Sequence, residues 1–238
     1  MSASVPIEER DGDGFRRRGF EVTRLQAFVD AAFAFAVTLL VISLDGIPRN
    51  VDQLLDAIAG IPAFAASFAL LALPWRMHTR YTWRFGLEDG PTTFWSLLLV
   101  FLVLVYVYPL KILFATFFGW ISGGALPAHF EIRRVDDLRV MFMVYGCAWA
   151  LLGSVVMALY RHAWNRRDAL GLDAGERLVL RLTLVSLGFM PVLGLASTAV
   201  AALLPQHPRG WMLALPGLVY FGMFAQWPVL AWYKRRRA

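Results

Sequence analysis

The sequence predicts an all-α polytopic membrane protein with six transmembrane helices. Hydrophobic residues fill 58% of the 238 positions and charged residues only 17%, and a soluble domain of this length could not bury so much apolar surface. A helix needs about 20 residues to cross the hydrocarbon core of a bilayer. Six apolar segments are long enough, at residues 22–45, 54–76, 92–119, 139–161, 178–204 and 210–233.

The distribution of charge predicts that both termini are cytoplasmic. Positively charged segments tend to stay on that side, and most of the 23 Lys and Arg residues lie before the first span, after the second and fourth spans, and behind the sixth. We divide the chain into a cytoplasmic arm (1–21), a six-helix transmembrane domain (22–233) and a basic cytoplasmic tail (234–238). The arm contains several carboxylates and no cleavage site follows the first span, so we expect no signal peptide.

The first span carries two charges at the edge of an apolar helix, Arg24 and Asp30. An ionisable group at membrane depth costs on the order of a few kcal/mol unless it is paired or faces water. The two residues are six positions apart, which is about 240° around a helix and excludes the usual i, i+4 pair. Each is therefore expected to interact with another helix.

The same helix carries an apolar stripe that consists of Phe35, Leu39 and Ile42, with Thr38 beside it. The spacing of i, i+4 and i+7 puts these side chains on one helix face. Such spacing is also typical of ordinary core packing, so it does not by itself separate a core from a pore. Copies of the helix arranged around an axis would stack these side chains into rings.

The later spans carry structural signals. Pro109 in the third span is expected to break a backbone hydrogen bond and kink the helix. Small residues four positions apart predict close helix packing in the fourth and fifth spans; they are Gly146, Ala150 and Ser154, then Gly194, Thr198 and Ala202. Tryptophans flank the sixth span, as in an aromatic belt.

Motifs typical of enzymes are absent from the sequence. It has no His-Glu-x-x-His pair, no phosphate-binding glycine loop and no serine in a nucleophile elbow, and its four histidines are dispersed. We expect no catalytic residue, no metal site and no cofactor. The net charge of +6 is explained by the basic residues of the segments that we place in the cytoplasm. No soluble domain that could present a basic face is predicted, so we expect no nucleic-acid partner.

The first two spans resemble the endosomal and lysosomal potassium channel (transmembrane protein 175) family. Its signature is an Arg, a Phe-Ser-Asp and a small residue on the first helix, followed by a tryptophan and a histidine on the second. The matching residues are Arg24, Phe28, Asp30 and Ala34, then Trp75 and His78. Val29 replaces the serine, and the single occurrence of the signature resembles the bacterial type with one six-helix unit.

This resemblance implies a homotetramer in the lipid of a bacterial inner membrane, with the first helices lining a pore for K⁺. It implies that rings at Phe35, Leu39 and Ile42, with a hydroxyl layer at Thr38, form an apolar constriction that selects the ion that sheds water more easily. It also implies that the signature residues hold the first helix to its neighbours. An Asp30 to His78 or Asp30 to Trp75 hydrogen bond is expected.

Two alternative functions stay open. Relatives carry an aliphatic residue at the position of Phe35, so the larger ring, together with Val29, favours a non-conducting membrane scaffold of the same fold. The other alternative is a secondary transporter that uses Asp30 to couple protons or sodium. Transporters usually place such groups near the midplane on broken helices, whereas Asp30 lies near one end of an unbroken span.

Overall fold

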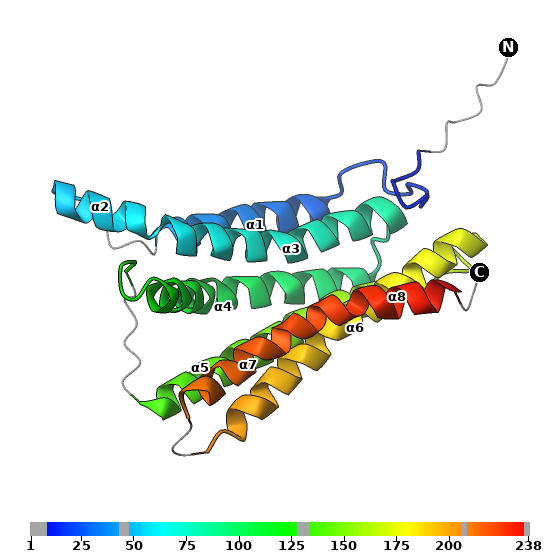
Figure 1. The fold of residues 1–238 in the computed structure, drawn as a ribbon. Helices are drawn as coiled ribbons and strands as arrows, with labels where there is room; N and C mark the ends of the chain where they lie inside the picture. Colours follow the sequence, from blue (N-terminus) through cyan, green and yellow to red (C-terminus); the bar gives the residue numbers. More distant parts are fainter. Residues whose placement is uncertain (1–8, 43–47, 128–133, 206–208, 236–238) are drawn as a thin grey trace, which may run out of the picture.

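The computed structural model describes residues 9–42, 48–127, 134–205 and 209–235, and all regular structure in these ranges is helical. Five long helices cross the bundle, α1 (Arg24–Ile42), α3 (Ile61–Phe85), α4 (Gly90–Ile121), α5 (Val135–Asn165) and α6 (Ala174–Ala202). A sixth crossing runs from residue 210 to 235 (Figure 1). Within these described ranges, six segments are long and apolar enough to cross a membrane, which confirms the predicted six transmembrane helices.

The second span differs from its prediction at both ends. A short helix, α2 (Val51–Ala59), precedes α3, and the two are separate because Pro62 has no backbone N–H with which to continue the hydrogen-bond ladder. At its other end α3 continues to Phe85 and stops at Gly86, which adopts the left-handed conformation with φ of 57°. Trp75 consequently lies inside α3 and not at its end.

The sixth span is not one continuous α-helix. It consists of the 3₁₀ turn η1 (Gly210–Ala214), α7 (Leu215–Leu218), the 3₁₀ segment η2 (Val219–Ala225) and α8 (Gln226–Arg235). Pro216, Gly217 and Gly222 fall within this stretch, and they weaken regular α-helical hydrogen bonding. The remaining predicted boundaries agree with the structure to within about four residues, which is common for helix ends.

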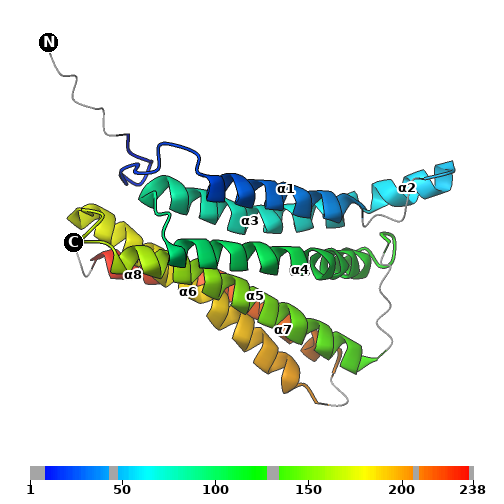
Figure 2. The ribbon, with the colours of Figure 1, turned by 180° about the vertical axis from the view of Figure 1, so that it is seen from behind.

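Pro109 lies inside α4, as the sequence predicts. The second half of α4 leaves the direction of the first half, as both views show (Figures 1 and 2). The hydroxyl of Tyr145 on α5 donates a hydrogen bond to the Pro109 carbonyl. The bend is thus tied to a neighbouring helix at Pro109, whereas the acceptor that loses its helical partner is the Val105 carbonyl, four residues earlier.

Consecutive long helices run in opposite directions, and the residues that precede α1 lie at the same end of the bundle as the end of α8 (Figure 1). The α3–α4 and α5–α6 turns lie at this end as well. We call it the arm end. In the structure the arm is residues 9–23, which are the described residues of the predicted arm (1–21) and the two residues before α1. An even number of crossings produces this arrangement.

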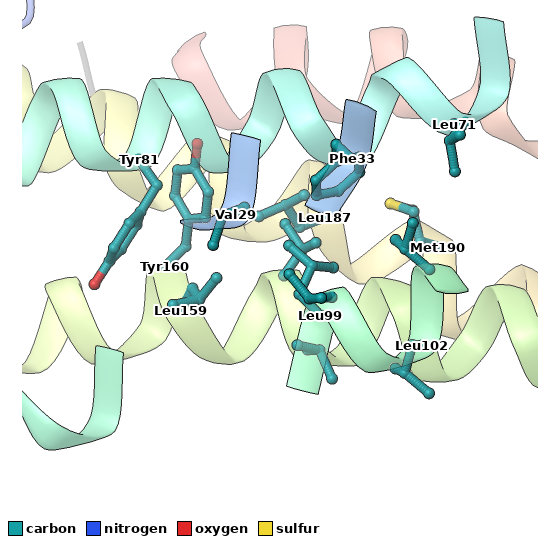
Figure 3. Packing of buried hydrophobic residues seen from close by; sticks show 14 of the residues in the cluster. Val29, Phe33, Leu71, Tyr81, Leu99, Leu102, Leu159, Tyr160, Leu187 and Met190 are labelled. Carbon is teal, nitrogen blue, oxygen red and sulfur yellow. The ribbon is translucent and has the colours of Figure 1, made fainter. Parts of the chain in front are cut away.

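The core joins side chains from α1, α3, α4, α5 and α6 (Figure 3). Val29 and Phe33 of α1, Leu99 of α4 and Leu187 of α6 all belong to this cluster and are labelled in the middle of Figure 3. Toward the arm end the core becomes aromatic; Tyr81, Phe85 and Tyr160 pack with ring centroids 5.2–6.0 Å apart. The α1 helix packs chiefly on α3 and α4, whereas α6 packs chiefly on α5.

The α5–α6 pair meets along the predicted small residues. A Cβ added to Gly194 would lie 2.5 Å from the Gly146 carbonyl oxygen and 2.7 Å from the Ala150 nitrogen. Both obstacles are backbone atoms, so the two helices touch main chain to main chain. The close packing predicted for these spans is confirmed at Gly146, Ala150, Gly194 and Thr198.

Candidate pore helix and the residues that hold it

The α1 helix has one buried face and one open face. Val29, Phe33, Ala36 and Leu40 are at most 5% exposed and pack into the core. On the opposite side the exposed residues recur at helical spacing, and they are Ala27, Phe28, Ala31, Ala34, Phe35, Thr38 and Val41. This apolar face of α1 has no partner within the described part of the chain.

The predicted pore residues divide between the two faces. Phe35 is 56% exposed, and Thr38 lies one turn further along the open face, with its hydroxyl donating to the Ala34 carbonyl at 3.0 Å. Leu39 is partly buried and packs against the core. Val41, which the sequence analysis did not select, is 45% exposed beside them. The side chain of Ile42 lies outside the described residues.

Asp30 is held by the second long helix. The indole Nε1 of Trp75 on α3 donates a hydrogen bond of 2.8 Å to Oδ1 of Asp30. Of the two expected bonds to this carboxylate, the one to Trp75 is the one that forms. The bond fixes α1 against α3 at a depth where an unpartnered carboxylate would be costly.

His78 contacts Ser96 on α4 and does not form the expected hydrogen bond to Asp30. Its side chain is 1% exposed, and its Nε2 lies 3.0 Å from the hydroxyl oxygen of Ser96 on α4. This bond joins α3 to α4. Asp30, Trp75, His78 and Ser96 thus link three helices by two hydrogen bonds.

The other signature residues take no part in these two bonds. Arg24 is exposed at the start of α1, and no hydrogen bond or ion pair joins it to another described residue. Phe28 and Ala34 lie on the open face. Val29, which stands in place of the signature serine, is completely buried, so at this position α1 packs by apolar contact.

A second polar contact joins the helix ends. His162 near the end of α5 binds Asp89, the N-cap of α4, with Nε2 2.7 Å from Oδ2. The Asp89 side chain also accepts bonds from the backbone and hydroxyl of Thr92. Burial alone would raise the pKa of Asp89, but the bonds from Thr92 and His162 lower it below its usual value. Sequence reasoning missed this pair because the partners are 73 residues apart.

This pKa shift predicts a pH-dependent effect of Asp89→Asn. A carboxyl whose pKa is lowered by folding stabilises the protein above its ordinary pKa of about 4, and the stabilisation is lost as the pH falls through the folded value. Asparagine keeps the helix cap but removes the charge. We expect the Tm difference between the native protein and Asp89→Asn to be large at pH 7 and to shrink below about pH 4. The exposed Asp136→Asn serves as control, and an equal Tm difference at all pH values would contradict the prediction.

No three His, Cys, Asp or Glu side chains among the described residues are placed to hold a metal ion. What the structure presents is a bundle with six potential membrane crossings and a first helix that is tied to its neighbours on one side and open on the other. These features define a polytopic integral membrane protein.

Comparison with known proteins identifies the family. The family model described as endosomal/lysosomal potassium channel TMEM175 matches residues 24–109. A potassium channel of Marivirga tractuosa is 33% identical over 168 residues, 68% of this chain and 67% of that protein. A potassium channel of Chamaesiphon minutus is 32% identical over 151 residues, 60% of this chain and 66% of that protein. The chain belongs to the TMEM175 potassium channel family.

Solved structures agree with this assignment. A crystal structure of the T38A variant of the potassium channel MtTMEM175, in complex with a nanobody fusion protein, has a TM-score of 0.81 and 26% identity, and the match covers 96% of this chain and 99% of that one. The crystal structure of a homologue of the lysosomal potassium-selective channel TMEM175, from Chamaesiphon minutus, has a TM-score of 0.53 and 21% identity, and the match covers 90% of this chain and 96% of that chain. This second likeness concerns the fold alone.

Proposed function

We propose that this protein is a K⁺-preferring cation channel of a bacterial inner membrane, assembled from four copies of the chain with α1 lining the pore. The open face of α1 is the observation that carries the proposal. Its opposite face is fully packed, and Asp30 and Trp75 fix the helix in place. A single chain contains one such helix, so a pore lined by it requires several chains around an axis.

Permeation through such a pore depends on the side chains of the open face. Phe35 would form an apolar ring, and Thr38 would add a hydroxyl close to it. A hydrophobic constriction gates by excluding water, and K⁺ releases its hydration water more readily than Na⁺. The ring therefore favours K⁺ by a difference in dehydration cost, without a filter of backbone carbonyls.

Support for the K⁺ preference comes from the relatives, whose names describe potassium channels. The proposed orientation places the arm end in the cytoplasm, because the arm and both turns at that end are rich in arginine. Leu39 and Ile42 complete the proposed constriction toward the other end of α1, with Leu39 reaching the pore from the edge of the open face.

The proposal predicts the effect of Phe35→Ile on ion flux into liposomes. A branched aliphatic side chain is smaller than a phenyl ring, so the constriction widens and K⁺ flux should rise severalfold. Phe101→Ile is the matched control, because Phe101 is 61% exposed and belongs to α4, not to the helix that is proposed to line the pore. Native protein should show faster K⁺ than Na⁺ flux, measured with opposed gradients.

The contrary result would favour a different function. If neither the native protein nor Phe35→Ile conducts, although both form folded oligomers, the chain is a membrane scaffold that shares the fold of the channels. Flux of K⁺ or Na⁺ that requires a proton gradient and stops in Asp30→Asn would instead favour a coupled transporter.

A further inference from the structure

The arm is a folded part of the molecule. Phe15 is fully buried and meets Phe85 of α3 edge to face, with ring centroids 5.4 Å apart. The turn before it is closed by Asp11, whose Oδ1 accepts hydrogen bonds from the backbone of Asp13 and Phe15. An aromatic side chain seated in this way adds a large apolar contact between the arm and α3.

One anchor of the arm is Arg84 on α3. Its side chain is only 1% exposed and donates to Asp11 and Asp13, each at 2.6 Å. The guanidinium also lies over the Phe15 ring, 4.8 Å from its centre. A planar guanidinium suits both contacts at once, because it donates in its plane and stacks on its face.

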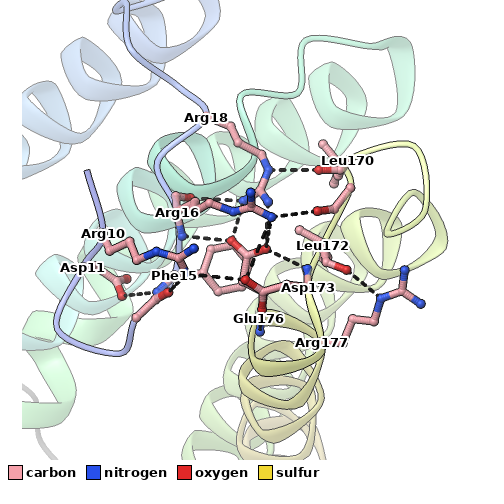
Figure 4. A network of polar contacts seen from close by, with 12 residues as sticks. Arg10, Asp11, Phe15, Arg16, Arg18, Leu170, Leu172, Asp173, Glu176 and Arg177 are labelled. Carbon is pink, nitrogen blue, oxygen red and sulfur yellow. Dashed lines mark hydrogen bonds and ion pairs between the residues drawn. The ribbon is translucent and has the colours of Figure 1, made fainter. Parts of the chain in front are cut away.

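The second anchor is Glu176 at the start of α6, whose side chain is completely buried (Figure 4). Its carboxylate accepts bonds from the guanidinium of Arg18 at 2.9 and 2.8 Å and from the backbone N–H of Arg16 at 2.9 Å. The Arg18 Nε also donates to the Leu170 carbonyl in the α5–α6 turn. A buried carboxylate with this many donors is fully satisfied only while the arm is in place.

The arm is also fitted closely to α3 just before α1 begins. The backbone N–H groups of Arg18 and Gly19 donate to the Trp83 carbonyl at 3.2 and 3.1 Å. A Cβ at Gly19 would overlap the Thr82 carbonyl, so only glycine allows this approach. Thr23 then caps α1 by accepting a bond from the Gln26 N–H at 3.2 Å.

We propose that the arm is a latch that positions the first helix, with Arg84 and Glu176 as its positioning residues. The arm binds both α3 and the α5–α6 turn, and only four residues separate Gly19 from Arg24, the first residue of α1. It therefore ties the arm end of α1 to a helix pair against which α1 packs little. If α1 lines the pore as proposed above, the latch keeps the apolar constriction narrow enough to discriminate between K⁺ and Na⁺; this role rests on the proposed function.

The test measures the position of α1 in spin-labelled protein and the ion selectivity in unlabelled protein, because a label at Ala27 lies on the open face of α1 that is proposed to line the pore. The full chain carries Cys147→Ser and two spin labels, at Ala27 on α1 and at Ala169 in the α5–α6 turn, both of which are exposed. Labelled protein is diluted with unlabelled protein so that distances within one chain dominate. The ratio of K⁺ to Na⁺ flux does not depend on how much protein is folded.

Two variants each disrupt a different contact of the latch. Glu176→Gln removes the carboxylate charge at nearly constant volume, and Gly19→Ala inserts one methyl group against the Thr82 carbonyl. The matched control is Asp168→Asn, which lies in the same turn and pairs with Arg177 and not with the arm. We expect both variants to at least double the width of the label distance distribution and to lower the K⁺ to Na⁺ flux ratio at least threefold, with the control unchanged.

Unchanged label distances in both variants would contradict the proposal that the arm positions α1. Broadened distances with an unchanged K⁺ to Na⁺ flux ratio would show that the arm does not govern ion selectivity. The proposed channel function fails separately, if the native protein shows no flux. In that case the distance measurement still decides whether the arm holds α1.

Discussion

Replacing Gly194 by alanine is expected to force α5 and α6 apart. The added methyl carbon would lie 2.5 Å from the Gly146 carbonyl oxygen, and backbone atoms in a packed helix pair cannot move aside as a flexible side chain would. We expect a loss of about 3 kcal/mol in the free energy of unfolding, equivalent to a Tm lower by roughly 6–12 °C. Thermal denaturation of the purified protein in detergent measures this.

Gly188 on the same helix supplies the control. A Cβ there meets nothing within 4 Å, so Gly188→Ala is expected to be neutral or to stabilise α6 by about 0.5–1 kcal/mol through its better helix propensity. Gly194→Ala should therefore lower the Tm, whereas Gly188→Ala should leave it unchanged or raise it. Equal shifts would mean that the α5–α6 contact is looser than the structure shows.

The second large effect is expected from Arg84→Met. Methionine keeps much of the apolar stem but leaves Asp11, which is 16% exposed, without its main cation. Burial alone would raise the pKa of Asp11, and the bond from Arg84, together with the backbone N–H bonds from Phe15 and Asp13, lowers it below its usual value. Removing one partner of a buried ion pair costs about 3 kcal/mol at the low end, and here that loss weakens the docking of the arm on α3.

An undocked arm should become accessible to protease. Residues 16–18 are three consecutive arginines, so trypsin should nick Arg84→Met there at least tenfold faster than the native protein, as followed by mass spectrometry. Arg80→Met is the control; Arg80 is 48% exposed and its ion pair with Asp13 is solvated, so its loss should matter little. Equal cleavage rates in native protein and Arg84→Met would contradict the role of Arg84 as an anchor.

The sequence was sufficient for the crossings, because long apolar segments are recognisable one by one. The Asp30 to Trp75 bond joins residues 45 positions apart; it was expected from the family resemblance, which left His78 open as the other partner. The anchors of the arm could not be predicted in this way. Arg84 and Asp11 are 73 residues apart and Arg18 and Glu176 are 158 apart, and charge alone does not select one partner among many.

Helix periodicity likewise sets a limit on the predicted pore face. Phe35 and Leu39 are about 40° apart around a helix. Their spacing alone therefore does not tell whether both are exposed or one of them is partly buried. The boundary between the buried and the open face is set by the packing of the buried residues Val29, Phe33, Ala36 and Leu40. This packing places Leu39 at the edge of the core. That packing depends on α3 and α4, which a single-helix pattern does not include.

The separate helix α2 has a consequence for the membrane in which this protein works. With its 25 residues, α3 is about 37 Å long, but Arg76, Arg80 and Arg84 lie on its last three turns. The uncharged part from Ile61 to Trp75 is only about 22 Å long and is shorter than a hydrocarbon core of about 30 Å. The exposed Val51, Leu54 and Ile58 of α2, the short helix that also carries Asp52 and Asp56, supply further apolar length in the 35-residue candidate span Val51–Phe85. A thicker bilayer would draw both carboxylates toward hydrocarbon, which ties this protein to a membrane of limited thickness.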